Sequence, residues 1–131
     1  GREYSPEYWP QEVGLDRLCK TDKPFLNRDA ALRVLQEPPR ERLVLLSLDP
    51  QDTDASNADA TGGEPIFLDG RGVGRVTSGA YGYSVGQSLA LGFVKDVDAG
   101  TEVEVMVLGR PHRAKILSAP PFDPEGRRLR A

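Results

Sequence analysis

The stretch Pro65-Ile-Phe-Leu-Asp-Gly-Arg-Gly-Val-Gly-Arg-Val-Thr-Ser78 decides the fold class of this chain. The run 65–69 ends with the first residue of the dipeptide Asp69-Gly70 and the run 72–78 follows it, and Asp-Gly between apolar runs is a strong signal for a tight β-hairpin. The closely spaced glycines also invite a dinucleotide-binding interpretation, but that fingerprint needs a helix directly after it. Because strand-like residues follow instead, we reject that site and expect the glycines to serve the turn and close backbone packing.

Similar runs surround the hairpin on both sides. Residues 102–108 alternate cleanly, with valines on one face and mainly glutamates on the other. Comparable segments lie at 42–48, 88–94 and 112–118, and a polar loop is expected from Asp49 to Gly63. About six strands at this spacing, with turn signals between them, are typical of a small antiparallel barrel or sandwich. The sequence therefore predicts a mainly β fold.

One helix is expected, over about 27–37. Asn27 is a favourable N-cap, Asp29 lies in the first turn where the helix dipole favours an acid, and Pro38-Pro39 ends the helix. A helix of this length is stable only when it packs against another element. It does not fit inside the barrel, so we interpret residues 1–39 as a docking arm or as the remnant of a preceding domain.

Composition and charge exclude several classes of protein. The chain has 131 residues, a net charge of −3, one cysteine and one histidine. A mildly acidic chain is not expected to bind nucleic acid, and no apolar run of about 18 residues predicts a membrane span. No disulfide within the chain and no metal cluster are expected either, because too few cysteine and histidine ligands are present. A cytoplasmic location is our expectation.

Few residues could carry chemistry. The single histidine, His112, has no neighbouring partner that suggests a catalytic triad, and a structural role in a strand is the commoner outcome. Cys19 precedes Lys20, which could lower its pKa, but a buried structural cysteine is more usual. The sequence thus offers no nucleophile with a base, no paired catalytic carboxylates and no phosphate loop. We expect this chain alone to be inactive.

Two segments could contact a ligand. Thr77–Ser84 places Tyr81 and Tyr83 on a predicted glycine-rich loop, where they would either plug one end of the barrel or stack on a flat heterocycle. The C-terminal segment concentrates arginines at 127, 128 and 130. Such a tail is usually solvated, although one arginine could hold a carboxylate through a bidentate pair.

Several motifs taken together resemble one family. They are Pro10-Gln-Glu-Val-Gly-Leu15, the run from Lys20 to Leu32, Gly72–Val94, Gly100–Val105 and Ala119-Pro-Pro-Phe122. The segment 72–94 is similar to the family pattern GxVTSGxxSPxLGKxIALGYV and is the most specific of them. The chain resembles the C-terminal part of the glycine cleavage T-protein, or aminomethyltransferase, family. Its ending resembles the carboxyl ends of sarcosine and dimethylglycine dehydrogenases more than it resembles stand-alone T-proteins.

The resemblance implies a fold, a chemistry and a division into domains. Residues 40–131 would form a Greek-key barrel, and residues 1–39 would be the tail of a central folate-binding domain. The parent protein would transfer a one-carbon unit to tetrahydrofolate in one-carbon and glycine metabolism, with FAD in an upstream domain. The barrel would close one side of a folate channel, whose catalytic aspartate lies in domains not present here. Tyr81, Tyr83 and Arg128 would face the ligand, and Glu12 would be a positioning carboxylate.

Two alternatives stay open. The T-protein architecture also occurs in regulatory relatives without the chemistry, so the chain could be a non-catalytic interaction module. It could also be a complete small barrel protein, which an initiator methionine directly before Gly1 would favour. The expected partners are folate and the upstream domains of the parent chain. A dimer of the isolated chain is a further expectation, because a helix separated from its domain exposes apolar surface.

Overall fold

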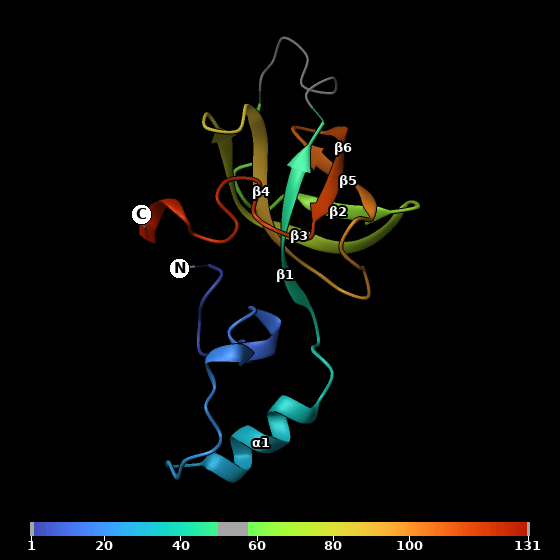
Figure 1. Ribbon diagram of the computed structural model, residues 1–131. Helices are drawn as coiled ribbons and strands as arrows, with labels where there is room; N and C mark the ends of the chain where they lie inside the picture. Colours follow the sequence, from blue (N-terminus) through green and yellow to red (C-terminus); the bar gives the residue numbers. More distant parts are fainter. Residues whose placement is uncertain (1, 50–57, 131) are drawn as a thin grey trace.

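The computed structural model describes residues 2–49 and 58–130 and is mainly β. Its helical elements come first and last in the chain, as the 3₁₀ turns η1 (Pro10–Glu12), η2 (Asp16–Leu18) and η3 (Arg128–Arg130) and the helix α1 (Arg28–Gln36). The strands are β1 (Arg42–Leu48), β2 (Pro65–Leu68), β3 (Arg71–Gly82), β4 (Gln87–Val94), β5 (Glu102–Val107) and β6 (Arg110–Leu117). Figure 1 shows the barrel above and α1 below it.

The six strands form a closed antiparallel barrel in the order β1-β4-β3-β2-β5-β6. β2, β3 and β4 follow one another by hairpins, and β1 lies beside β4 after a long connection, which is the Greek-key arrangement. The turn at Asp69-Gly70 has both residues at positive φ, 50° and 76°, as a tight hairpin requires. The predicted fold class and the predicted hairpin are both confirmed.

Alternation along each strand separates a core face from an outer face. The core is built from inward-facing aliphatic residues of all six strands, with Leu46, Ile66, Val94, Val105 and Ile116 among those that are fully enclosed. Phe93 is also 0% exposed, yet it is not part of this core cluster. It lies on the outer face of β4, so something outside the barrel must cover it.

The predicted loop over Thr77–Ser84 is wrong in its first part. β3 continues to Gly82 and pairs with β4 from Ser78 to Gly82, after a register shift between Val76 and Ser78. Glycines permit this long ribbon, because a Cβ at Gly79 would lie 2.2 Å from the Ala60 carbonyl oxygen. Glycine is thus needed at this position because a side chain would not fit, and not because glycine favours strands.

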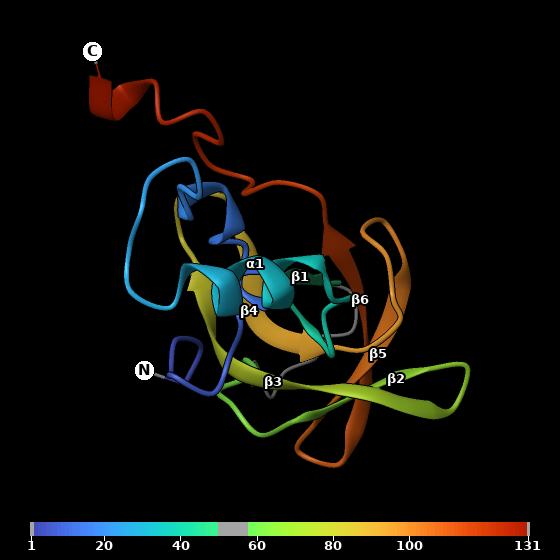
Figure 2. The same ribbon diagram turned by 90° about the horizontal axis from the view of Figure 1, so that it is seen from below.

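The helix was predicted correctly within a residue at either end. Asn27 is the N-cap, but it makes no side-chain capping bond. Its φ is 62°, a left-handed conformation that Asn tolerates, and α1 begins directly after it. No residue of α1 is buried. Figure 2, viewed from the α1 side, shows the helix in front of β1 and β4. In the part of the chain that the structure describes, no helix has the length and apolarity needed to cross a membrane.

Candidate functional site

The outer face of β1, β4 and β3 carries an open apolar groove of about 390 Å³. Its floor is formed by outward-facing Leu45, Leu89 and Leu91, which are adjacent in the strand register, and Ser78 and Ala80 border it on β3. These leucines are only partly buried, although they lie in the middle of paired strands. An apolar depression of this kind is a candidate for contact with another body or with a ligand.

The two predicted tyrosines lie at the far end of the same ribbon. Tyr81 is opposite Ser88, whose side chain is buried, whereas Ala80 is opposite Leu89 on the groove side. Tyr81 is itself among the residues that line the groove, and Tyr83 lies directly after the end of β3 at Gly82. They meet edge to face with centroids 5.1 Å apart, and Tyr83 is 90% exposed. The structure brings these two residues together at the end of β3.

A chain segment beside the groove covers Phe93. The Tyr8 ring stacks on the Phe93 ring with centroids 4.2 Å apart and planes at 11°. Arg75 lies across the same ring, donates to the Tyr8 hydroxyl at 2.9 Å and forms a two-bond pair with Glu41, both bonds also 2.9 Å. The hydrogen bonds to the Glu41 carboxylate are the largest influence on the pKa of Arg75, and they raise it. The N-terminal arm is therefore fastened to the outer face of β4 and β3.

The arm continues along β3 towards the groove. Ser78 Oγ donates to Glu3 Oε1 at 2.7 Å, and Arg2 donates to the Thr77 carbonyl oxygen at 3.5 Å. The bond from Ser78 lowers the pKa of Glu3. Since Ser78 also borders the groove, the arm contacts a residue of the groove's lining.

Glu12, predicted to be a positioning carboxylate, is buried with 1% of its surface exposed. The Arg40 guanidinium donates to both carboxylate oxygens at 2.7 Å, and the backbone N–H groups of Trp9 and Arg40 donate at 2.8 and 3.0 Å. These bonds, of which those from the Arg40 side chain have the largest effect, hold the pKa of Glu12 down at about 2. The charge is compensated within the chain, and the contacts of Glu12 position Arg40 at the start of β1.

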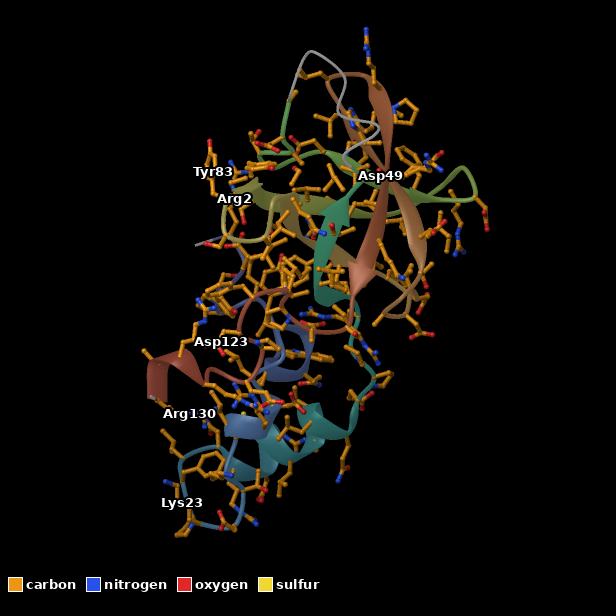
Figure 3. The ribbon with its side chains drawn as sticks, turned by 45° about the horizontal axis from the view of Figure 1, so that its top comes forward. Arg2, Lys23, Asp49, Tyr83, Asp123 and Arg130 are labelled. Carbon is orange, nitrogen blue, oxygen red and sulfur yellow. The ribbon has the colours of Figure 1, made fainter. Side chains whose placement is uncertain are left out.

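Arg128 lies in the C-terminal turn and makes local contacts. Its guanidinium stacks over Phe122 at 4.9 Å, and its N–H donates to Asp123 at 3.1 Å. Figure 3 shows Tyr83 beside the barrel and Arg130 well below it, at the C-terminal turn. The structure does not bring Arg128 to the tyrosines, so its role towards a ligand stays a prediction.

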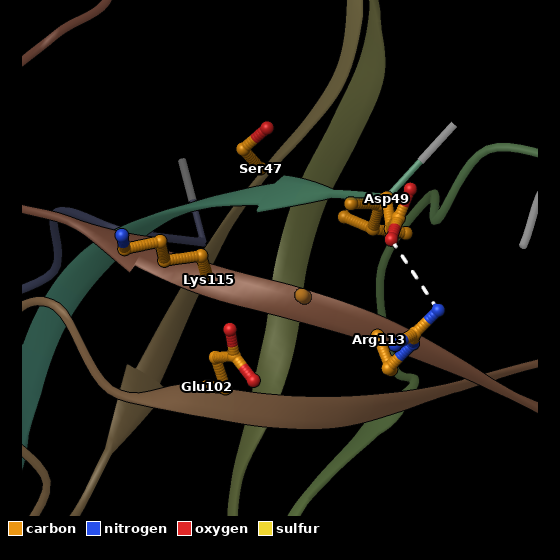
Figure 4. Close-up of a pocket in the computed structure, with 7 residues that line it drawn as sticks. Ser47, Asp49, Glu102, Arg113 and Lys115 are labelled. Atoms are coloured by element: carbon orange, nitrogen blue, oxygen red, sulfur yellow. Dashed lines mark ion pairs between the residues drawn. The ribbon is translucent and has the colours of Figure 1, made fainter. Parts of the chain in front are cut away.

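A second, smaller depression lies on β6, outside the sequence expectations. It measures about 220 Å³ and is lined by Ser47, Asp49, Glu102, Arg113 and Lys115 (Figure 4). Arg113 pairs with Asp49 at 3.6 Å, and Glu102 is opposite Lys115 in the strand register. Opposite charges alternate across these strands, which is the ordinary pattern of a solvated sheet surface.

His112 and Cys19 take structural positions. His112 is buried on the inner side of β6, and its Nδ1 has no hydrogen-bond partner among the described residues. Cys19 is half-buried and its Sγ lies 3.8 Å from the Leu15 carbonyl oxygen. The predicted loop at 49–63 falls mostly on residues 50–57, which lie outside the described ranges. Neither His112 nor Cys19 lies in the groove.

The chain is a closed Greek-key barrel domain with an arm across its outer face. Comparison with known proteins identifies the family of this domain. The model of the "Glycine cleavage T-protein C-terminal barrel domain" matches residues 41–123. The chain belongs to this family. Among solved structures it is similar to the glycine cleavage system aminomethyltransferase T of Bartonella henselae, with a TM-score of 0.80 and 25% identity over 95% of this chain and 35% of that one. The resemblance inferred from the motifs is confirmed.

Relatives include both transferases and dehydrogenases. The chain is 33% identical to 4-methylaminobutanoate oxidase (formaldehyde-forming) of Paenarthrobacter nicotinovorans over 99% of its length, and 35% identical to mouse mitochondrial dimethylglycine dehydrogenase over 92%. It is 30% identical to an aminomethyltransferase of Symbiobacterium thermophilum over 98%. The chain spans only 16%, 14% and 34% of these relatives. It corresponds to a part of each.

Proposed function

We propose that this chain is the C-terminal domain of a tetrahydrofolate-dependent, aminomethyltransferase-like protein, in which it closes one side of a folate channel. The observation that carries the proposal is the apolar groove floored by Leu45, Leu89 and Leu91 on the face to which the arm also docks. An uncovered apolar depression beside a docked segment favours further packing of protein on that face. The tyrosine-bearing ribbon then ends at the border between the barrel and the packed domain.

The proposal includes the domain boundary and the parent protein. Residues 1–39 belong with a preceding folate-binding domain and residues 40–131 form the barrel domain, as the lack of buried residues in α1 supports. The parent is a flavin-dependent sarcosine or dimethylglycine dehydrogenase, with FAD in an upstream domain. The match to dimethylglycine dehydrogenase supports this choice. A cytoplasmic location completes the proposal, and cell fractionation would test it.

Within the channel, the exposed side chains would act by stacking and charge. Tyr81 and Tyr83 offer aromatic surface and phenolic hydroxyls to a flat heterocycle. Arg128 would pair with a carboxylate of the ligand, because a guanidinium binds carboxylates in a bidentate manner. The chain supplies walls and orientation, and the chemistry is supplied by the upstream domains.

The test is a calorimetric titration of tetrahydrofolate into this chain and into the longer protein. We expect binding by the longer protein alone, weakened by Tyr81→Ala and Tyr83→Ala. The control is Tyr4→Ala, because Tyr4 is an exposed tyrosine of the arm. Equal binding by the isolated chain would contradict the channel-wall role and give the tyrosines and terminal arginines a site of their own. Binding by neither protein would contradict the folate hypothesis.

A second candidate is a non-catalytic regulatory or interaction module. The charge compensation of Glu12 within the chain favours it, because a carboxylate that already accepts four hydrogen bonds has little capacity left for a ligand. The two candidates differ in turnover. If the longer protein oxidises a methylated amine and transfers the one-carbon unit, the enzyme is supported. If it shows no such activity but still binds a partner without folate, the module is supported.

A further inference from the structure

Two adjacent residues of the turn η1 hold two different elements. The Gln11 side-chain amide donates to the Val34 carbonyl oxygen at 2.6 Å and to the Glu37 carbonyl oxygen at 3.4 Å. Both carbonyls lie at the C-terminal end of α1, and the Val34 carbonyl oxygen also accepts a bond from the Glu37 N–H at 3.1 Å. Gln11 therefore binds the end of α1.

Glu12, the next residue, binds the start of β1. Its carboxylate accepts two side-chain bonds and one backbone bond from Arg40, two residues before the strand begins. The Arg40 guanidinium also donates to the Glu7 carbonyl oxygen at 2.7 Å and lies over the Trp9 ring at 4.5 Å. Arg40 thus contacts the segment that contains η1 through Glu7, Trp9 and Glu12, while 54% of its side chain stays exposed.

The link between the two held ends is short and stiff. Only residues 37–41 separate α1 from β1, and two of them, Pro38 and Pro39, have a fixed φ. The structure gives α1 no buried residue, and the barrel core cluster contains none from the arm. Hydrogen bonds from η1, rather than packing in a shared core, therefore set the direction of α1 relative to the barrel.

We propose that η1 is a joint that fixes the angle between α1 and the barrel, with Gln11 and Glu12 as its two positioning residues. Glu12 is buried and Gln11 is half-buried, which supports this role. Among the described residues Gln11 Oε1 is buried without a hydrogen-bond partner, so the amide is held by the bonds of its Nε2 alone. Glu12 keeps its charge in the joint, since Arg40 holds its pKa at about 2.

The joint has a consequence for the longer protein, and this step alone rests on the proposed function. If α1 belongs to the preceding domain, the angle set at η1 determines which face of the barrel meets that domain. A change at Gln11 or Glu12 would then displace the groove and the tyrosines without touching them.

The joint is tested on this chain by measuring a distance between α1 and the barrel. Spin labels are placed on Arg33→Cys in α1 and Arg71→Cys at the start of β3, both exposed, in a Cys19→Ser background. Pulsed electron resonance should give one narrow distance distribution. We expect Gln11→Met and Glu12→Gln each to lose that single narrow distribution, because α1 then samples several directions.

Matched controls separate the joint from general destabilisation. Gln36→Met makes the same change on the exposed surface of α1, and Glu7→Gln removes the same charge from an exposed side chain of the arm. Both should keep the narrow distribution, and circular dichroism should show that every variant is folded at the temperature of measurement. An unchanged distribution in Gln11→Met and Glu12→Gln, or equal broadening in the controls, would overturn the joint. No folate is involved, so the outcome is independent of the proposed function.

Discussion

Glu12 carries a charge where solvent hardly reaches, and it does so because four donors converge on it. One donor residue, Arg40, lies 28 positions after Glu12 in the sequence, and the other, Trp9, directly precedes η1. Charge-assisted bonds of this kind are roughly twice as strong as neutral ones. A motif that resembles a family signature thus has a direct structural use in this chain, which is to connect the arm to the start of the barrel.

The contribution of Glu12 to stability should depend on pH. Its folded pKa of about 2 lies below the ordinary value of 4.5, so its stabilisation is present above 4.5 and is lost as the pH falls through about 2. We expect Glu12→Gln to lower the free energy of unfolding by about 1.5–3 kcal/mol at pH 7. Urea denaturation from pH 7 to pH 2 should show this difference shrink with acidification. A difference that is constant across the range would contradict the assignment.

At the scale of elements, backbone approach explains the glycine-rich β3. A Cβ at Gly74 would lie 2.0 Å from the Phe93 carbonyl oxygen in the paired strand β4. Gly72, two residues earlier, has only a Phe67 ring carbon at 3.9 Å. Neither has a positive φ, so the two positions differ in the space available and not in backbone conformation.

The two glycines should therefore respond oppositely to alanine. Gly74→Ala must separate β3 from β4 and is expected to cost about 3 kcal/mol, the scale of strongly overpacked sites. Gly72→Ala should be neutral or should stabilise by about 0.5 kcal/mol, because it restricts the unfolded chain without a clash. Thermal denaturation of the two variants checks this. A similar loss in both would show that close backbone approach is not what β3 requires at Gly74.

At the scale of the whole molecule, a compact barrel carries a projecting arm with exposed apolar residues. Leu26 is 89% exposed, and Leu18 and Phe25 are also exposed on the segment before α1. The groove adds partly buried leucines on the barrel itself. Such surface is unusual on a monomer and explains the expectation that the isolated chain associates with itself.

Self-association should depend on the arm. We expect sedimentation velocity to show the average mass of this chain rising with concentration, and Leu26→Lys to reduce that rise. Leu129→Lys is the control, because Leu129 is 91% exposed in the C-terminal turn rather than on the arm. Equal reduction by both variants would point to non-specific hydrophobic contact. No concentration dependence in the unchanged chain would contradict the expectation of a dimer.

The sequence by itself determined the strands, the Asp69-Gly70 hairpin, the helix and the family, because local alternation, turn chemistry and motif spacing are encoded within short segments. Only the tertiary structure showed that the predicted loop at Tyr81 is a strand, since pairing with β4 extends it. It alone showed that Tyr8 covers Phe93. The pairing of Glu12 with Arg40 likewise joins residues far apart in the chain. Contacts of this kind depend on how the arm folds back on the barrel, and no local pattern records that path.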